Sequence, residues 1–185
     1  GMIAILGSFD TTVSLTFDVF DRSNLAVAFN DAASDRTLHE LRSLPGVIEA
    51  EPARSVPVIL RHGLRDHHGT IDGLISPQRL NLALDAELRP IPLRAGGVVL
   101  GRTLANALGV RAGDFLDVEV RTGRRPRLSL PVVGVAGTVM GAPAFMDLDS
   151  LNRALREPNR VSGAWLRIDE AKASSIYRAL KRMPS

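Results

Sequence analysis

The chain has 185 residues, of which 45% are hydrophobic and 23% charged, a composition typical of a folded globular protein rather than a disordered one. Its length fits one ordinary domain or two small subdomains. The formal net charge is only +3, which does not favour nucleic-acid binding, and the absence of cysteine excludes disulfides and thiolate metal sites.

Apolar side chains recur about four positions apart near the N-terminus, which predicts an amphipathic helix over residues 2–20. The apolar positions are Ile5, Phe9, Val13, Phe17 and Phe20. Threonines at positions 11, 12 and 16 are weak helix formers, so a strand is the alternative. Gly1 precedes Met2, and we expect the chain to be a piece of a longer protein.

The next segment combines short strands with one helix. Strands are predicted over residues 25–29, 47–51, 55–61 and 70–75, with Pro52 separating the second from the third. The helix follows Asp35, carries leucines 38, 41 and 44 on one side and ends at Pro45-Gly46. Residues 62–69 form a polar turn, so the strands on either side of them make a hairpin.

Residues 97–120 predict a strand, a helix, a tight turn and a second strand, after an irregular connection over residues 76–96. One apolar stripe at helical spacing consists of Leu100, Leu104, Ala107 and Leu108. Gly109 follows the stripe at the position where glycine often ends a helix, and Gly113-Asp114 is typical of a turn.

The last third predicts strands over residues 128–139, a helix from Asp147 to Pro158, a strand over residues 164–168 and a final helix from Asp169 to Pro184. The outer parts of the chain have α/β layering, and the middle resembles an inserted β-rich module. The predicted fold class is therefore α+β.

Three histidines, His62, His67 and His68, lie close together with Asp66 and raise the hypothesis of a metal-dependent hydrolase. However, His67 and His68 are adjacent, so on a strand they would face opposite ways. The segment also has the character of a solvated hairpin tip. We predict no metal site and no cofactor.

The remaining polar motifs do not indicate catalysis. Arg121, Arg124, Arg125 and Arg127 form a basic turn without the aromatic residues that stack on bases, which favours a solvated loop. The glycines of residues 96–113 lack the pattern of a phosphate-binding loop, and Ser162-Gly163 is not a nucleophile elbow. Asp114 is expected to stabilise a turn. No catalytic residue is predicted.

The order of several motifs resembles the extracytoplasmic domain of FtsX/MacB-type ABC transporter permeases, the periplasmic core domain between their first two membrane helices. The resemblance covers roughly residues 20–184. The motifs are Leu44-Pro45-Gly46-Val47, Gly97-Val98-Val99-Leu100, Leu104-Ala105, Leu108-Gly109-Val110, Ala112-Gly113-Asp114, Pro131-Val132-Val133-Gly134-Val135, Ala144-Phe145-Met146-Asp147-Leu148 and Leu180-Lys181-Arg182-Met183-Pro184.

This resemblance implies that residues 1–20 continue an excised membrane helix. It also implies a porter-like α/β subdomain from residues 21–75 and 142–185, with a β-rich subdomain inserted at residues 76–141. The domain would be non-catalytic and extracytoplasmic, at the cell membrane. Its implied partners are a cytoplasmic ATPase subunit acting through the full-length permease, a second permease copy, and a substrate, lipoprotein or periplasmic partner protein. The alternative is a small-barrel ligand-binding module of a cytosolic regulator or enzyme.

Overall fold

The computed structural model describes residues 3–7, 11–16, 25–76, 78–80, 82–138 and 141–183. The chain divides into two units, each with its own hydrophobic core. Unit 1 comprises Gly1–Arg54, Pro77–Leu82 and Asn159–Ser185, and unit 2 comprises Ser55–Ser76 and Ala83–Pro158. Both ends of the chain therefore belong to unit 1.

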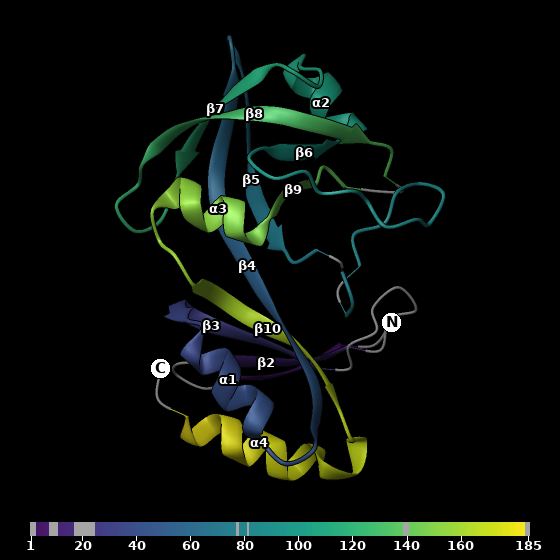
Figure 1. Ribbon diagram of the computed structural model, residues 1–185, viewed down its shortest axis with the longest axis vertical. Coiled ribbons are helices and arrows are strands. Elements are labelled where there is room, and N and C mark those ends of the chain that lie inside the picture. The colour runs from purple at the N-terminus through teal and green to yellow at the C-terminus, as the bar shows by residue number, and fades with distance from the viewer. Residues whose placement is uncertain are drawn as a thin grey trace. The chain divides into compact units, whose positions relative to one another are not determined.

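Unit 1 is an antiparallel sheet with helices on one face (Figure 1). Its strand order is β1(Ile3–Gly7), β2(Thr11–Thr16), β3(Leu25–Ser34), β10(Arg160–Ile168) and the first part of β4(Val47–His62). Helices α1(Arg36–Ser43) and α4(Ala173–Arg182) bury leucines 38, 41 and 180 and Ile176 against this sheet, and the 3₁₀ turn η1(Glu170–Lys172) precedes α4. Helices on one side of an antiparallel sheet confirm the predicted α+β class.

Unit 2 is a closed six-stranded barrel. The strand order is the second part of β4, then β5(Arg65–Leu74), β9(Ala144–Asp147), β6(Val98–Gly101), β8(Arg127–Ala136) and β7(Phe115–Val120), which pairs with β4 again. Helices α2(Arg102–Leu108) and α3(Leu148–Leu155) add Leu104, Leu108 and Leu151 to the barrel core. With few aromatic residues available, this core is filled by aliphatic side chains.

The helix predicted over residues 2–20 is wrong for the two segments that the structure describes there. Strands β1 and β2 pair antiparallel, with Ile3 opposite Thr16 and Gly7 opposite Thr12. β-Branched residues suit a pleated strand, and β3 offers β2 a pairing partner that an isolated sequence pattern does not reveal. Phe9, Phe17 and Phe20 lie outside the described residues.

The first crossing of the chain from unit 1 to unit 2, between Arg54 and Ser55, lies inside β4, whereas the sequence predicts boundaries at residues 75 and 142. The two strands expected on either side of Pro52 form one 16-residue strand, β4. In unit 1, β4 is the last strand of the sheet, and proline is tolerated at such an edge because its missing N–H is not needed for pairing. Strand β9 was not predicted, because four residues leave too short a pattern.

Both helices of unit 2 end in a residue with left-handed backbone geometry. Gly109 N–H donates to the Asn106 carbonyl and Val110 N–H to that of Ala105, which confirms the predicted helix end as a Schellman motif. Helix α3 ends with the same pair of bonds, but its left-handed residue is Arg156, with φ 56°.

We expect Arg156→Gly to stabilise the protein by about 0.5–1 kcal/mol, because the left-handed penalty for a residue with a Cβ slightly exceeds the entropy that glycine adds to the unfolded chain. Gly109→Ala makes the reverse change at the equivalent position of α2 and should destabilise the protein by about 1 kcal/mol. Urea denaturation measures both. A destabilised Arg156→Gly variant would show that the arginine side chain makes a larger contribution than its backbone strain.

Candidate functional site

The described structure does not bring the three histidines together as one set of ligands. Nδ1 of His62 lies 3.0 Å from the carbonyl oxygen of Leu108, and because a carbonyl only accepts, this nitrogen carries the proton. His67 is half-buried and His68 exposed on β5, as expected for adjacent strand residues. Across the described ranges, no group of three or more His, Asp or Glu side chains could hold a metal ion.

His62 and Arg65 instead hold the C-terminal end of α2. Nη1 of Arg65 lies 3.4 Å from the carbonyl oxygens of both Asn106 and Ala107, next to the bond from His62 to Leu108. The carbonyl of Asn106 also accepts the Gly109 N–H, whereas those of Ala107 and Leu108 lie beyond the last bonds of the helix, where a cation also interacts favourably with the helix dipole. The polar hairpin predicted at residues 62–69 therefore has a structural contact with α2.

Asp114 stabilises the turn between α2 and β7, as the sequence predicted. Its Oδ2 accepts the N–H of Arg111 at 2.9 Å, and its own N–H donates to the Arg111 carbonyl. The bonds from Gly113 N–H to the Val132 carbonyl and from Val132 N–H to the Asp114 carbonyl join the turn to β8.

We expect Asp114→Ala to lower the free energy of unfolding by about 0.5–1.5 kcal/mol, because the Arg111 N–H loses its acceptor. Asp114→Asn retains an acceptor oxygen and should lose less than half of that amount. Urea denaturation of the two variants tests the difference. Equal losses would mean that the carboxylate charge, rather than the turn bond, carries the effect.

The outer face of β4, β7 and β8 carries a groove of about 390 Å³, lined among others by Arg61, Asp117, Glu119 and Arg127. Glu119 lies between the two arginines, with Oε2 3.4 Å from Arg61 Nη1 and Oε1 3.2 Å from Arg127 Nη2. Desolvation raises the pKa of Glu119, but Arg61 and Arg127 together bring it below its ordinary value. Both arginines of the groove thus already have an anionic partner.

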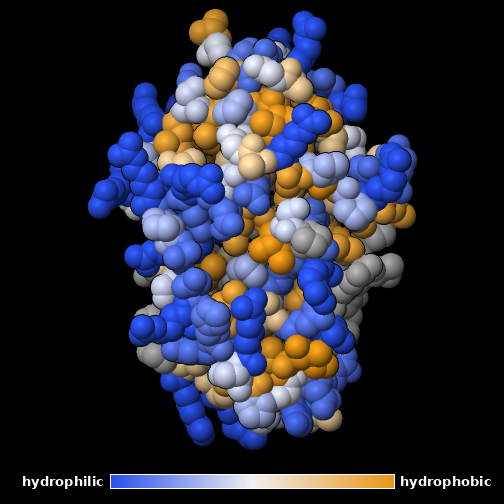
Figure 2. Space-filling view, viewed as in Figure 1, coloured by the Kyte–Doolittle hydropathy of each residue, from blue (hydrophilic) through white to orange (hydrophobic). Residues whose placement is uncertain are grey.

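The arginine loop, residues 121–127, connects β7 to β8. Figure 1 shows it projecting from the barrel, and in Figure 2 hydrophilic side chains gather on the same side. Arg121, Arg124 and Arg125 are exposed, and within the part of the chain that the structure describes they form no ion pair. Arg125 N–H donates to the Thr122 carbonyl and closes the turn.

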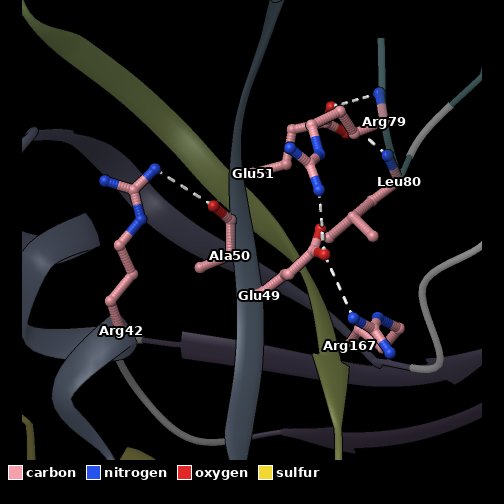
Figure 3. Close-up of polar contacts among 7 residues, drawn as sticks. All are labelled: Arg42, Glu49, Ala50, Glu51, Arg79, Leu80 and Arg167. Atoms are coloured by element: carbon pink, nitrogen blue, oxygen red, sulfur yellow. Dashed lines mark hydrogen bonds and ion pairs between the residues drawn. The ribbon is translucent and has the colours of Figure 1, made fainter.

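In unit 1, two carboxylates of β4 hold the segment that contains Arg79 and Leu80 (Figure 3). Oε1 of Glu51 accepts the N–H of Arg79 at 2.9 Å and that of Leu80 at 3.3 Å. Oε1 of Glu49 accepts bonds from Arg79 Nη2 at 3.1 Å and from Arg167 Nη2 at 3.0 Å. Glu51 is only 5% exposed, so these contacts fix the segment on the sheet.

No motif of the sequence singles out this carboxylate pair. Glu49 and Glu51 are two positions apart in a predicted strand, which places both side chains on one face. That spacing was a usable signal for a shared polar partner. The partner itself, a backbone segment some 30 residues later, could not be found from local patterns.

The bond from Arg167 is the largest cause that lowers the pKa of Glu49 from its ordinary value of 4.5, and Arg79 lowers it further. A carboxyl whose pKa is lower in the folded state stabilises the fold above its unfolded-state pKa, and this contribution is lost as the pH falls through the folded-state pKa. We expect Arg167→Gln to raise the pKa of Glu49 toward 4.5, as measured by NMR titration of the side-chain carboxyl carbon. An unchanged pKa would mean that Arg167 does not pair with Glu49 in solution.

A carboxyl with a raised pKa is found in unit 2. Burial raises the pKa of Asp72, which a hydrogen bond with Ser55 partly offsets. Asp72 lies on β5 opposite Phe145 of β9 and does not line the groove. Burial in the strand therefore accounts for the raised pKa of Asp72.

The comparisons with known proteins bear on the fold. No protein family profile matches the sequence, and no curated protein matches it. The structure is similar to the extracellular domain of the noncanonic ABC-type transporter YknZ from Gram-positive bacteria, with 14% identity, a TM-score of 0.52 and 78% of each chain covered.

A second similar structure is the periplasmic region of MacB from Actinobacillus actinomycetemcomitans. It shares 15% sequence identity with this chain, with a TM-score of 0.52, and the match covers 95% of this chain and 84% of that one. In the described residues, no helix combines the length and the apolar character needed to cross a membrane. The resemblance inferred from the ordered motifs is confirmed at the level of the fold, which this chain shares with the extracytoplasmic domains of YknZ and MacB.

Proposed function

We propose that this chain is a non-catalytic extracytoplasmic domain of an ABC transporter permease. In this proposal it couples the movement driven by a cytoplasmic ATPase subunit to the handling of a substrate or partner protein outside the membrane. The observation that carries the proposal is the fold, since the match to the periplasmic region of MacB extends over 95% of the chain.

Under this proposal, the two units correspond to the two expected subdomains. We assign unit 1 as the porter-like subdomain, because its sheet and helices come from both ends of the chain, and the barrel of unit 2 as the inserted subdomain. Membrane helices at the two ends would both join unit 1. Their movement would reach the barrel through β4, a strand that continues without a break from one unit into the other.

The polar groups of the described residues support a domain without chemistry of its own. Glu49, Asp85 and Glu119 have lowered pKa values through arginine contacts or backbone hydrogen bonds, and Asp72 a raised one through burial. Each shift has a local structural cause. Under the proposal, the partners of the domain are the ATPase subunit, a second permease copy, and the substrate, lipoprotein or periplasmic protein that is handled.

The alternative is a small-barrel ligand-binding module of a cytosolic protein, which the closed barrel and the 390 Å³ groove on β7 and β8 favour. The two proposals differ in what surrounds the chain. The permease proposal expects apolar segments of about 20 residues before Met2 and after Ser185 in the parent protein, whereas a cytosolic protein has hydrophilic flanks.

Purification of the parent protein from its native membrane tests the function itself. We expect an ATPase subunit to co-purify with it. We also expect ATP hydrolysis by the reconstituted complex to change in the Gly163→Ala variant, in which the added Cβ would overlap the Val27 carbonyl of β3 and destabilise unit 1. Hydrophilic flanks, or a parent protein that is recovered from the soluble fraction without an ATPase, would overturn the permease proposal.

A further inference from the structure

The arginine loop concentrates the positive charge of this protein. Residues 121–127 contain four of its 23 Lys and Arg residues and none of its 20 Asp and Glu residues. The rest of the chain thus has 19 basic against 20 acidic side chains, so the loop alone carries more charge than the whole molecule. Because the rest of the chain has no net positive charge, the loop accounts for the net positive charge of the protein.

Three of these four arginines are available to a partner. Arg127 is engaged with Glu119, whereas Arg121, Arg124 and Arg125 are exposed and form no ion pair with any residue that the structure describes. Guanidinium groups bind phosphate through paired N–H donors. The free donors of the loop therefore match a surface that presents several phosphates.

We propose that the arginine loop docks on the headgroups of anionic phospholipids. The one apolar residue of the loop, Pro126, is half-buried, so the loop has no exposed apolar side chain that could enter a protein pocket. The groove beside it offers no free positive charge, because Arg61 and Arg127 both pair with Glu119. An acidic peptide would need such a pocket or groove for its affinity. A bilayer surface needs only a projecting cationic loop and closely spaced anions (Figure 1).

The expected affinity of the arginine loop for an anionic membrane is modest. At about fivefold per arginine, three free arginines raise the partition coefficient onto an anionic surface by about 100-fold over a neutral one. Such binding is weak for a free domain, but it orients a domain that is already held beside the membrane. The inference rests on the proposed function only for that tethering, since the loop can be tested without it.

The experiment measures co-sedimentation of the full 185-residue chain with vesicles of phosphatidylcholine, alone or mixed in equal parts with phosphatidylglycerol. The test variant combines Arg121→Ser, Arg124→Ser and Arg125→Gly. Glycine is chosen at position 125 because its φ is 52°, a geometry that glycine adopts without strain. The control variant removes the same charge from exposed positions of α4, with Arg178→Gln, Lys181→Gln and Arg182→Gln.

We expect the parent chain and the α4 control to prefer phosphatidylglycerol vesicles by about 100-fold at low salt, and the loop variant to lose most of this preference. The preference should also disappear at about 1 M salt, where the Debye length falls to about 3 Å. Equal binding to both vesicle types, or an equal loss in the α4 control, would overturn the proposal. So would tighter binding of an oligoglutamate peptide than of the vesicles. None of these outcomes bears on whether the parent protein is a permease.

Discussion

Gly163→Ala should destabilise unit 1 by about 3 kcal/mol or more, because a Cβ at this position would overlap the backbone of the neighbouring strand. The added atom would meet the carbonyl oxygen of Val27 and the Cα of Ala28 on β3. A backbone cannot rotate away as a side chain does, so β10 and β3 would have to separate. Fluorescence of Trp165, the single tryptophan, measures the effect during urea denaturation, because it lies two residues away on β10.

Gly134→Ala is the matched control. Gly134 also lies in a strand, β8, but a Cβ there would make ordinary contacts of 3.7 Å with the side chain of Val99. Its effect on the unfolding of the barrel, followed by circular dichroism, should stay within about 1 kcal/mol. If Gly163→Ala were as mild as Gly134→Ala, the close pairing of β3 and β10 at this position would be incorrect.

Glu51→Ala should lower the stability of unit 1 by about 2–4 kcal/mol, because one buried and one partly buried N–H group lose a charged acceptor. The carboxylate accepts from Arg79 and Leu80 and lies directly opposite Trp165 in the ladder between β4 and β10. Urea denaturation followed by Trp165 fluorescence therefore measures the loss close to its origin. Hydrogen exchange at Arg79 and Leu80 should increase in the same variant.

Two further variants separate the contribution of the buried acceptor from that of the negative charge. Glu51→Gln keeps an acceptor oxygen and should lose about half as much as Glu51→Ala. Glu49→Gln removes a more exposed carboxylate with arginine partners and should change stability by about 1 kcal/mol or less. A Glu49→Gln variant as damaged as Glu51→Ala would mean that the ion pairs, rather than the buried backbone bonds, hold the segment.

Several elements could be predicted because local signals agreed with the final packing. The turn of Gly109 and Asp114 is one example, since its glycine and its side-chain acceptor act within a few residues. Helix α3 is another, because Asp147 accepts the N–H of Ser150 at the expected N-cap. In both cases the sequence pattern and the tertiary structure require the same local geometry.

Elements defined by distant partners could not be predicted. The five apolar positions of residues 2–20 fit a helix, and only pairing with β3 explains why the described segments are strands. The unbroken β4 depends on having β10 beside Pro52 in one unit and β7 beside Val58 in the other. The same holds for the site, where Glu51 binds a backbone segment that no local pattern connects to it.

The most direct test of the proposed location uses the absence of cysteine from this chain. Leu64 lies at the tip of the hairpin between β4 and β5 and is 106% exposed, whereas Leu104 in the barrel core is 1% exposed. Leu64→Cys and Leu104→Cys are introduced separately into the parent protein, with any cysteine outside this chain replaced. Intact cells are then treated with a membrane-impermeant maleimide.

We expect the cysteine at position 64 to react in intact cells as fully as after lysis, and the cysteine at position 104 to react only after denaturation. Reaction at position 64 that occurs only after lysis would place the domain in the cytoplasm and contradict the permease proposal.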